Sequence, residues 1–358
     1  MVTCFIVYGS PAERSARISY NDPMLPRVLG LDIGGANLKA AHSDGDARTV
    51  SFPLWKHPDR LADELVRLCS AMPAYGSLAI TMTGELCDCF TSKRDGVHAI
   101  LQCVRSISQE IPVCVWSTHS RFLDFDEAMR DPLRVAAANW LAVAHFVAQQ
   151  FKDENVLLID TGSTTTDIIY LNHGNPEPRG LTDVNRLTTG ELVYTGVRRT
   201  PICAMLGMEV AAEFFATMLD AYLLDGSLPE NAEDCDTADG RPATRACAHA
   251  RLARMCCADV DSFSLVQAQE LAARALRAQR QAVGNAVTGL LVGRPAVQRL
   301  VVSGSGEMLG RTVAAGRALV VTSFSELLGP ALSDAACAYA VAMLAAQKFS
   351  DRVAPGGR

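Results

Sequence analysis

The chain has 358 residues, of which 49% are hydrophobic and 20% are charged, and its formal net charge at pH 7 is −6. This composition supports a large packed core, excludes global disorder and argues against a nucleic-acid partner, because the sequence contains no run of basic residues. At this length two domains of ordinary size are expected.

The first 26 residues are not expected to form a signal peptide. They lack a basic start and a long apolar core, and no apolar run in the sequence reaches transmembrane length. We expect residues 1–26 to form a disordered extension, with Met24 as an alternative start of translation. We also expect no membrane partner.

Strands and helices alternate in the first half of the chain. Apolar stretches at 27–33 and 38–42 predict a hairpin that turns on Gly34-Gly35, and residues 59–72 predict a helix with its leucines on one face. The other expected elements are strands at 50–53, 78–82 and 112–117 and a helix at 97–108. This alternation is typical of an α/β domain.

The second half begins in the same way as the first. Residues 155–160 and 166–171 predict another hairpin around a glycine turn. Helices are expected at 206–223 and 265–292, with a polar segment at 225–245 between them and a buried strand at 297–303. The repeat predicts two related domains.

Two alanine-rich helices are expected to join these domains. One covers residues 134–151 and includes Ala136, Ala137 and Ala138, and the other covers residues 334–346. Small side chains let two helices cross closely. We therefore assign residues 27–154 and a return helix at 331–348 to the first domain and residues 155–330 to the second.

Two glycine turns carry the strongest functional signal. Each ends an apolar strand on an aspartate, turns on glycine and resumes with a second strand; the segments are Leu31-Asp32-Ile33-Gly34-Gly35-Ala36-Asn37-Leu38-Lys39 and Leu158-Ile159-Asp160-Thr161-Gly162-Ser163-Thr164-Thr165-Thr166-Asp167. Such a turn points successive backbone N–H groups into one concavity, which suits a phosphate. The leading aspartates, Asp32 and Asp160, can hold Mg²⁺ through water.

Together the two turns predict a cleft that grips a polyphosphate from both sides. The expected phosphate-binding residues are Gly34, Gly35, Asn37, Lys39, Gly162, Ser163, Thr164 and Thr165. Lys39 can equally be a point charge on the phosphate or a cap on the hairpin. A third loop, Gly304-Ser305-Gly306, follows a strand and opens a helix at Glu307. No segment has the spacing of the Rossmann or P-loop glycine motifs, so both of those folds are excluded.

These features resemble the actin–Hsp70–sugar-kinase superfamily. The turns at Asp32 and Asp160 are similar to its two phosphate loops, and Gly304-Ser305-Gly306 is similar to its adenosine loop. The resemblance covers nearly all residues after Met24. It implies an α/β, actin-like ATPase fold, in which two ribonuclease H-like domains enclose a phosphate-binding cleft with Mg²⁺-bound phosphates at its base.

Further segments resemble a narrower branch, the hydantoinase/oxoprolinase-related proteins. They are 81–86, 189–194, 198–201, 237–240 and 251–255. Together they are most similar to the family of tetrahydromethanopterin-linked one-carbon-transfer proteins, whose archaeal relatives are condensing enzymes of methanofuran biosynthesis. That resemblance implies a transferase that joins an aminomethylfuran diphosphate to a phenol derived from tyramine or tyrosine and releases pyrophosphate.

The implied reaction needs a cradle for the diphosphate and a base for the phenol, whose unperturbed pKa is about 10. The candidate bases are Glu85, Asp88, Asp167, Glu191 and Asp239. Asp88 is better explained as a solvated turn residue, whereas Glu191 is equally explained as a carboxylate at the start of a helix.

Several charged and aromatic residues remain open to two interpretations. Arg199 and Arg254 could clamp a phosphate or a carboxylate, whereas Arg251 and Arg254 share a helix face that could form surface salt bridges. The acidic residues Asp234, Asp236 and Asp239 could bind a second metal, although a flexible charged loop explains them better. Trp55 and Trp116 are expected in the core.

The cysteines give no metal site. Twelve occur, no two form a C-x-x-C pair, and the seven histidines form no H-x-x-x-H pattern. We expect free buried thiols in a reducing compartment, and hence a cytoplasmic protein. A homodimer is compatible with the sequence.

Two other functions share the predicted cleft. One is an ATP-dependent enzyme, either a small-molecule kinase or an ATP-driven hydrolase of the hydantoinase/oxoprolinase type. The other is a non-catalytic nucleotide-binding assembly protein. The length of 358 residues is short for the hydrolase, and no base aspartate of a kinase stands out.

Overall fold

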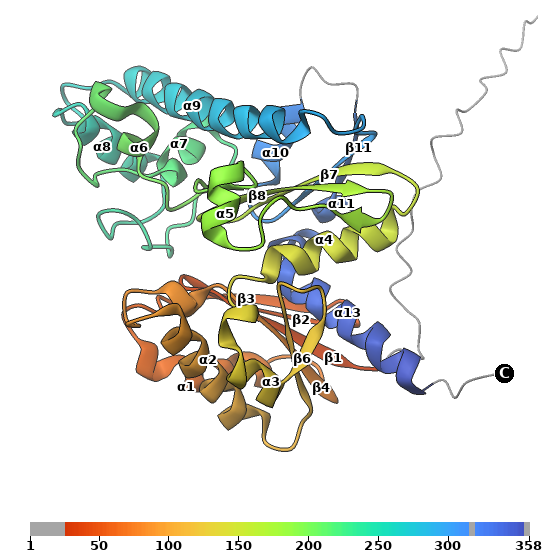
Figure 1. Cartoon of the computed structure of the whole chain (residues 1–358). Coiled ribbons are helices and arrows are strands. Elements are labelled where there is room, and N and C mark those ends of the chain that lie inside the picture. The colour runs from red at the N-terminus through yellow and green to blue at the C-terminus, as the bar shows by residue number, and fades with distance from the viewer. Residues whose placement is uncertain (1–25, 315–318, 354–358) are drawn as a thin grey trace, which may run out of the picture.

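The chain folds into two halves, each built on a six-stranded sheet, as a computed structural model shows for residues 26–314 and 319–353 (Figure 1). The first sheet has the order β3-β2-β1-β4-β5-β6. Its strands are β1 Val28–Ile33, β2 Asn37–His42, β3 Ala47–Ser51, β4 Ser77–Met82, β5 Val113–Trp116 and β6 Phe122–Asp124. β1 pairs antiparallel with β2 and parallel with β4.

The second sheet repeats this arrangement. Its strands are β7 Asn155–Thr161, β8 Thr166–Asn172, β9 Asn175–Pro176, β10 Leu192–Val193, β11 Arg299–Ser303 and β12 Val320–Ser323. The order is β10-β8-β7-β11-β12, with β9 also paired to β8. β7 pairs antiparallel with β8 and parallel with β11, as β1 does with β2 and β4. The predicted duplicated, ribonuclease H-like fold of actin-like ATPases is therefore confirmed.

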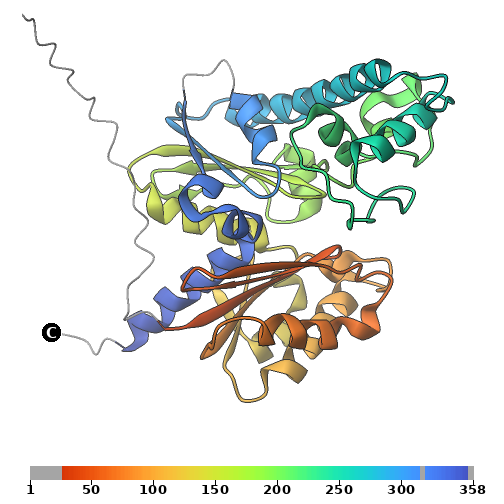
Figure 2. The ribbon, with the colours of Figure 1, turned by 180° about the vertical axis from the view of Figure 1, so that it is seen from behind.

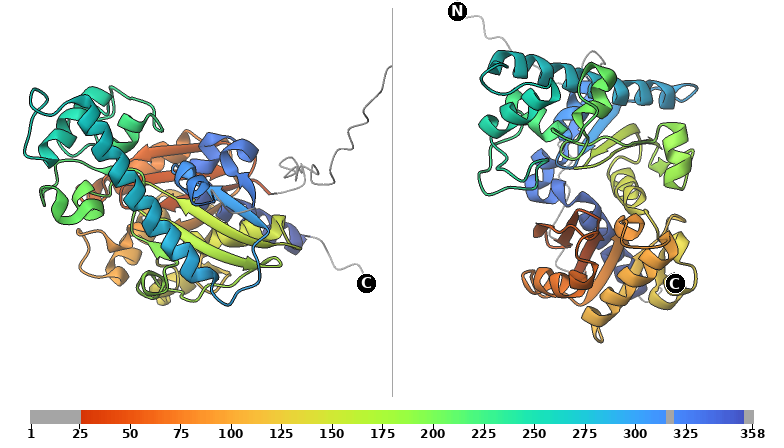
Figure 3. Two further views of the ribbon diagram at one scale, coloured as in Figure 1. Left: turned by 90° about the horizontal axis from the view of Figure 1, so that it is seen from above. Right: turned by 90° about the vertical axis from the view of Figure 1, so that its left-hand side faces the viewer.

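Helices cover both sheets and form an additional group in the second half. Those with the first sheet are α1 Leu61–Ser70, α2 Lys93–Ser108 and α3 Phe125–Arg130. The second half carries α5 Asp183–Thr189, α6 Ile202–Leu206, α7 Met218–Asp225, α8 Arg245–Met255, α9 Leu265–Leu291 and α10 Glu307–Ala314. Figure 3 shows α9 crossing the second half, where Val283 and Val287 pack against Leu157 and Ile168 of the sheet.

Two buried helices, α4 (Asn139–Gln150) and α13 (Ala336–Val353), lie between the sheets (Figure 1). They pack on each other, and the rings of Phe146 and Tyr339 meet edge to face at 5.5 Å. α13 also presses on β1 so closely that a Cβ at Gly30 would lie 1.9 Å from the Ala338 carbonyl oxygen. Glycine on the strand thus allows the close approach.

Two short helices, α11 (Phe324–Leu328) and α12 (Pro330–Asp334), return the chain from the second sheet to the first (Figure 2). At the end of α12 the Asp334 carboxylate accepts a hydrogen bond of 2.6 Å from Thr49 on β3. The helix that follows, α13, packs on β1, β2 and β4 of the first sheet.

The structure corrects two of the expected helices. The helix expected at 134–151 begins only at Asn139, because Ala137 has a φ of 46°, which breaks the helix despite the helix propensity of alanine. The helix expected at 206–223 is interrupted between Leu206 and Met218. Gly207, with a φ of 59°, ends α6, and a capping box at Thr217 starts α7.

The expected disordered extension falls, apart from residue 26, outside the described residues. Across residues 26–314 and 319–353, no helix is both long and apolar enough to cross a membrane. Within the same ranges no disulfide joins the cysteines.

Candidate functional site

A cavity of about 650 Å³ is lined by residues from both halves of the chain. The two glycine turns contribute to its wall, as does the loop that follows β4. Of the residues singled out in the sequence, the cavity brings together the following: Asp32, Gly34, Gly35, Asn37, Lys39, Glu85, Asp88, Asp160, Gly162, Ser163, Thr164, Thr165, Asp167 and Arg199.

The two glycine turns have the same hydrogen bond. The N–H of Gly34 donates to the Asn37 carbonyl at 3.0 Å, and the N–H of Gly162 donates to the Thr165 carbonyl at 2.9 Å. The turns also touch, because Asn37 Nδ2 donates to Ser163 Oγ at 3.4 Å. The duplicated hairpins therefore meet at the cavity, and both line it.

The segment around Gly196 supports the second turn from behind. A Cβ at Gly196 would lie 2.5 Å from backbone atoms of Gly162, Ser163 and Thr164, so only glycine fits there. The N–H of Val197 donates to the Gly162 carbonyl at 3.1 Å, and those of Arg198 and Arg199 both donate to the Ser163 carbonyl at 3.0 Å. These contacts hold the backbone of the second turn in place.

Three aspartates, Asp32, Asp160 and Asp167, form an acidic group that lines the cavity and is at least nine-tenths buried. Burial, together with the neighbouring carboxylates, raises the pKa of Asp32 and of Asp160 to about 6. Asp160 Oδ1 accepts from Ser303 at 2.7 Å, whereas Asp32 Oδ1 has no hydrogen-bond partner among the described residues. A buried carboxylate oxygen without a partner is costly, and a cation would stabilise it.

Lys39 supplies part of the missing positive charge. Its Nζ donates to the Asp334 carbonyl oxygen and lies 3.3 Å from the Asp334 carboxylate. Burial lowers the pKa of Lys39, but attraction by Asp334 and Asp32 raises it above the usual value. The lysine therefore connects the first turn to α12 and remains charged beside the aspartates.

The acidic group is not a complete metal site on its own. In the part of the chain that the structure describes, no group of three or more His, Cys, Asp or Glu side chains could hold a metal ion. Mg²⁺ commonly takes only one or two carboxylates and fills its other positions with water and phosphate oxygens. Asp32 and Asp160 could serve in that way.

Asp167 is held by an arginine that the sequence analysis did not single out. Arg186 on α5 is 1% exposed, and its Nη2 lies 2.8 Å from Asp167 Oδ1. The guanidinium also lies 3.9 Å from the ring of Trp140, and it donates to the Glu191 carbonyl at 3.0 Å. Burial raises the pKa of Asp167 even though Arg186 lowers it. In the sequence this region carries one weak signal. Thr182 is a residue type that favours the N-cap of a helix, and it precedes the short helix α5 that carries Arg186.

Glu85 and Asp88 differ in their environment. Glu85 is 1% exposed, and its Oε2 has no partner within the described ranges. Burial raises its pKa to about 7. Asp88 is exposed at the cavity wall. A base acts best when its pKa lies near the working pH, so Glu85 is the better placed of the two carboxylates.

The structure corrects the role expected for Glu191. This residue is fully buried and is not among the described residues that line the cavity. Its Oε1 accepts from the N–H of Arg179 at 2.6 Å, and its Oε2 accepts from the N–H of Gly180 and from Thr189, both at 2.9 Å. The carboxylate thus closes a loop around α5, and it cannot reach a substrate.

The loop Gly304-Ser305-Gly306 packs at the end of β7, next to the cavity-lining Asp160, and the nucleotide contact expected for it stays a prediction. A Cβ at Gly304 would lie 2.3 Å from the Thr161 carbonyl oxygen, and one at Gly306 would lie 2.7 Å from Val197. The loop is therefore packed onto the end of β7. No residue of this loop belongs to the described lining of the cavity.

Glu307, directly after this loop, locks the start of α10. One oxygen of its buried carboxylate accepts from the N–H of Ser325 at 2.8 Å and from Ser333 at 2.5 Å. The other oxygen accepts from Ser323 and, at 2.7 Å, from the Ser325 hydroxyl. The contacts tie α10 to α11 and α12, which leaves this carboxylate a structural role.

Arg199 and Trp55 meet across the cavity. The Arg199 guanidinium lies 4.4 Å from the Trp55 ring, and both residues line the cavity. Trp55 is thus half-buried in the wall, whereas Trp116 is buried in the core as expected. The pair joins the two halves through a cation–π contact.

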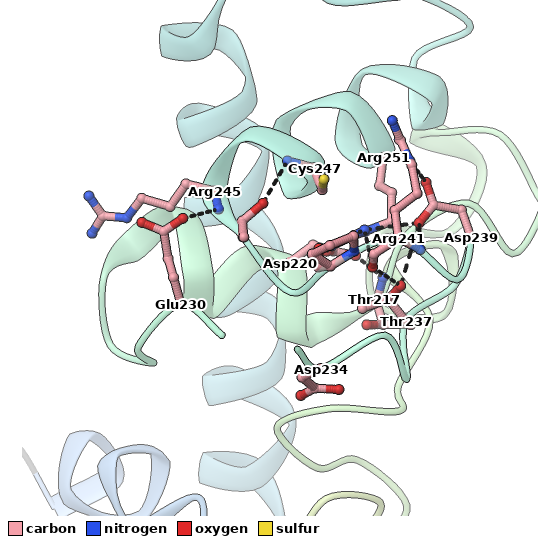
Figure 4. Close-up of polar contacts among 12 residues, drawn as sticks. Thr217, Asp220, Glu230, Asp234, Thr237, Asp239, Arg241, Arg245, Cys247 and Arg251 are labelled. Atoms are coloured by element: carbon pink, nitrogen blue, oxygen red, sulfur yellow. Dashed lines mark hydrogen bonds and ion pairs between the residues drawn. The ribbon is translucent and has the colours of Figure 1, made fainter. Parts of the chain in front are cut away.

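The acidic loop at 234–239 is held by arginines (Figure 4). Arg251 is fully buried between Asp220 at 2.7 Å and Asp239 at 2.9 Å, and Arg254 approaches Asp239 at 3.4 Å. Asp234 forms a two-pronged pair with Arg198, at 2.8 and 3.1 Å. Burial raises the pKa of Asp239, but hydrogen bonds from Arg241, together with the hydrogen bond and charge of Arg251, outweigh it and lower this pKa to about 2. These aspartates are paired, so neither a second metal nor a phosphate clamp is formed here.

Comparisons with known proteins give the chain a family and distant structural relatives. Residues 77–348 match the hydantoinase/oxoprolinase family. A protein of Methanocaldococcus jannaschii is 37% identical over 243 residues, which are 65% of this chain and 72% of that protein. One of Methanococcus vannielii is 36% identical over 129 residues, which are 34% of this chain and 57% of that protein. Both carry the name (4-{4-[2-(gamma-L-glutamylamino)ethyl]phenoxymethyl}furan-2-yl)methanamine synthase.

Among solved structures, an archaeal actin homologue is 14% identical with a TM-score of 0.46. The match covers 90% of this chain and 99% of the homologue.

Proposed function

This chain belongs to the hydantoinase/oxoprolinase family, and from that premise we propose that it is a condensing transferase of methanofuran- or methylofuran-type cofactor biosynthesis. It joins an aminomethylfuran diphosphate to a phenol derived from tyramine or tyrosine. The name shared by the two archaeal relatives contains a phenoxymethyl-furan, which is the aryl ether that such a condensation forms. The proposal places the protein in one-carbon metabolism linked to tetrahydromethanopterin.

The observation that carries the proposal is the pair of facing glycine turns above an acidic group with an unpartnered oxygen. Backbone N–H groups of the turns would bind the diphosphate, and Lys39 adds a positive charge beside it. Asp32 and Asp160 would hold Mg²⁺, which would neutralise the charge that develops on the leaving group. The unpartnered Asp32 Oδ1 fits this assignment.

The proposed reaction exchanges one C–O bond for another. The bond between the furan methylene carbon and the bridging oxygen of the diphosphate breaks, and its electron pair leaves with pyrophosphate. The phenol oxygen bonds to the same carbon, and its proton passes to a base. Glu85 is the assigned base, because it is buried in the cavity wall with a pKa of about 7 and its Oε2 has no hydrogen-bond partner among the described residues.

A nucleotide is the weaker candidate ligand. The loop that was expected to contact adenosine is packed against Thr161 and Val197 and does not belong to the described lining of the cavity. No observation on the described residues favours the assembly-protein alternative.

The test is direct synthesis. The protein is incubated with synthetic aminomethylfuran diphosphate, tyramine or tyrosine, and Mg²⁺, and mass spectrometry follows the ether while a coupled assay follows pyrophosphate. We expect equal amounts of ether and pyrophosphate without ATP. ATP turnover that depends on a small molecule, with no ether, would refute the transferase.

A further inference from the structure

The cavity has an apolar wall that the phosphate chemistry does not explain. Four of its lining side chains are large, hydrophobic and exposed: Leu86 at 63%, Val184 at 70%, Leu187 at 48% and Tyr194 at 65%. Two of them lie on α5, and Tyr194 follows β10. Exposed apolar side chains that gather inside a cavity indicate contact with an apolar ligand surface.

A pair of opposite charges from the two halves also lines this cavity. Lys93 is the first residue of α2, and Asp183 is the first residue of α5. Lys93 Nζ lies 3.1 Å from Asp183 Oδ2, and the two side chains are 28% and 26% exposed. A partly exposed pair of this kind contributes little to stability, so a ligand with its own charges can replace it.

We propose that this wall and this charge pair form the acceptor subsite, in which Lys93 and Asp183 recognise an amino-acid head group on the phenol. The aromatic ring packs on the apolar wall, the carboxylate of the head group binds Lys93, and its ammonium binds Asp183. The inference rests on the proposed function, because the acceptor is the phenol of that reaction.

Charge complementarity selects this head group. The α-amino acid group carries an ammonium and a carboxylate on one carbon, and Lys93 and Asp183 present the opposite charges side by side. An acceptor with only an amine would pair with Asp183 alone, and one with only an acid would pair with Lys93 alone. Each charge can therefore be tested separately.

The experiment crosses two variants with phenols of different charge. The KM of the Lys93→Met and Asp183→Asn variants is measured for five phenols. Tyrosine and γ-glutamyltyramine carry both charges. Tyramine carries only the ammonium, 3-(4-hydroxyphenyl)propionate carries only the carboxylate, and p-cresol carries neither. Arg67→Met is the control variant, because it breaks an ion pair of 2.7 Å on α1 that is not part of the described cavity lining.

For Lys93→Met we expect KM to rise about tenfold for acceptors with a carboxylate and to stay unchanged for tyramine and p-cresol. For Asp183→Asn the same rise should appear for acceptors with an ammonium. KM for the furan diphosphate should stay unchanged in both variants. An equal rise of KM for all acceptors and for the diphosphate would show that the ion pair only holds the two halves together, and it would overturn the inference. Unchanged KM values in both variants would also overturn it.

Calorimetric binding of the same phenols separates this inference from the proposed function. If the wild type forms ether and the variants keep its preference among the acceptors, the subsite inference is overturned but the proposed function is not. Absence of ether with every acceptor would overturn the proposed function; weaker binding of tyrosine or γ-glutamyltyramine to the variants would then still support the subsite. Absence of binding of any phenol to the wild type would overturn the subsite as well.

Discussion

Replacing Glu85 by glutamine tests whether a buried carboxylate is held ready as a base. Burial raises the pKa of Glu85 from 4.5 to about 7. At about 1.36 kcal/mol for each pKa unit, the charged form costs the folded state about 3 kcal/mol. The folded protein binds the Glu85 proton more tightly than the unfolded chain does. The contribution of protonated Glu85 to the free energy of unfolding is therefore fully present below the unfolded pKa of 4.5, and it is lost as the pH rises through about 7.

The Glu85→Gln variant removes that penalty. Near pH 4 the variant and the wild type should therefore have equal free energies of unfolding in urea. Near pH 8 the variant should be more stable by up to about 3 kcal/mol. Ether formation should fall sharply in the variant, and the wild-type rate should rise with pH through about 7. The exposed Asp88→Asn change is the control and should alter neither quantity.

A stability difference that does not vary with pH would refute the raised pKa. A variant that is more stable near pH 8 and still makes ether at the wild-type rate would refute the role as a base while keeping the assigned environment.

Three further predictions concern the metal site, the helix crossing and the buried arginine. Asp160→Asn should abolish Mg²⁺-dependent ether formation and leave the circular dichroism spectrum unchanged; full activity would remove this residue from the metal site. Gly30→Ala should destabilise the protein by about 2 kcal/mol or more in urea, since the added carbon would meet the α13 backbone at 1.9 Å. Gly289→Ala, where the carbon would meet no described atom within 4 Å, should instead be neutral or stabilising, and equal effects would contradict the packing argument. Arg186→Met should cost about 3–5 kcal/mol, because it leaves Asp167 buried without its partner; a cost below about 1 kcal/mol would show that solvent reaches this pair.

The fold could be predicted because its signals are local. A strand that ends at an aspartate and turns on glycine appears twice, at Asp32 and at Asp160, and each forms the expected hairpin. The long helix at 265–291 was also readable from its apolar period and lies within one residue of the expected range. Such features depend on neighbours in the sequence, so the residues alone determine them.

The failures concern residues whose contacts or backbone angles are set only in the folded chain. Glu191 appeared to be available, yet its oxygens are occupied by Arg179, Gly180 and Thr189 in the folded chain. Ala137 has the propensity of a helix residue and adopts a positive φ where the chain turns into α4. Neither outcome is visible without the tertiary structure.

Arg186 escaped attention for the same reason. Its partner Asp167 lies on β8, and only the packing of α5 brings the two together. The apolar residues around α5 also had no distinctive pattern in the sequence, and they form a wall only beside the loops from the other half.

The central claim is that the diphosphate leaves as pyrophosphate while the phenol keeps its oxygen. The measurement that tests it most directly uses a tyrosine-type phenol whose hydroxyl carries heavy oxygen, with aminomethylfuran diphosphate and Mg²⁺. Our account predicts that mass spectrometry finds the label in the ether and none in the pyrophosphate. Label in a phosphorylated phenol, with no ether, would show attack on phosphorus and contradict the account.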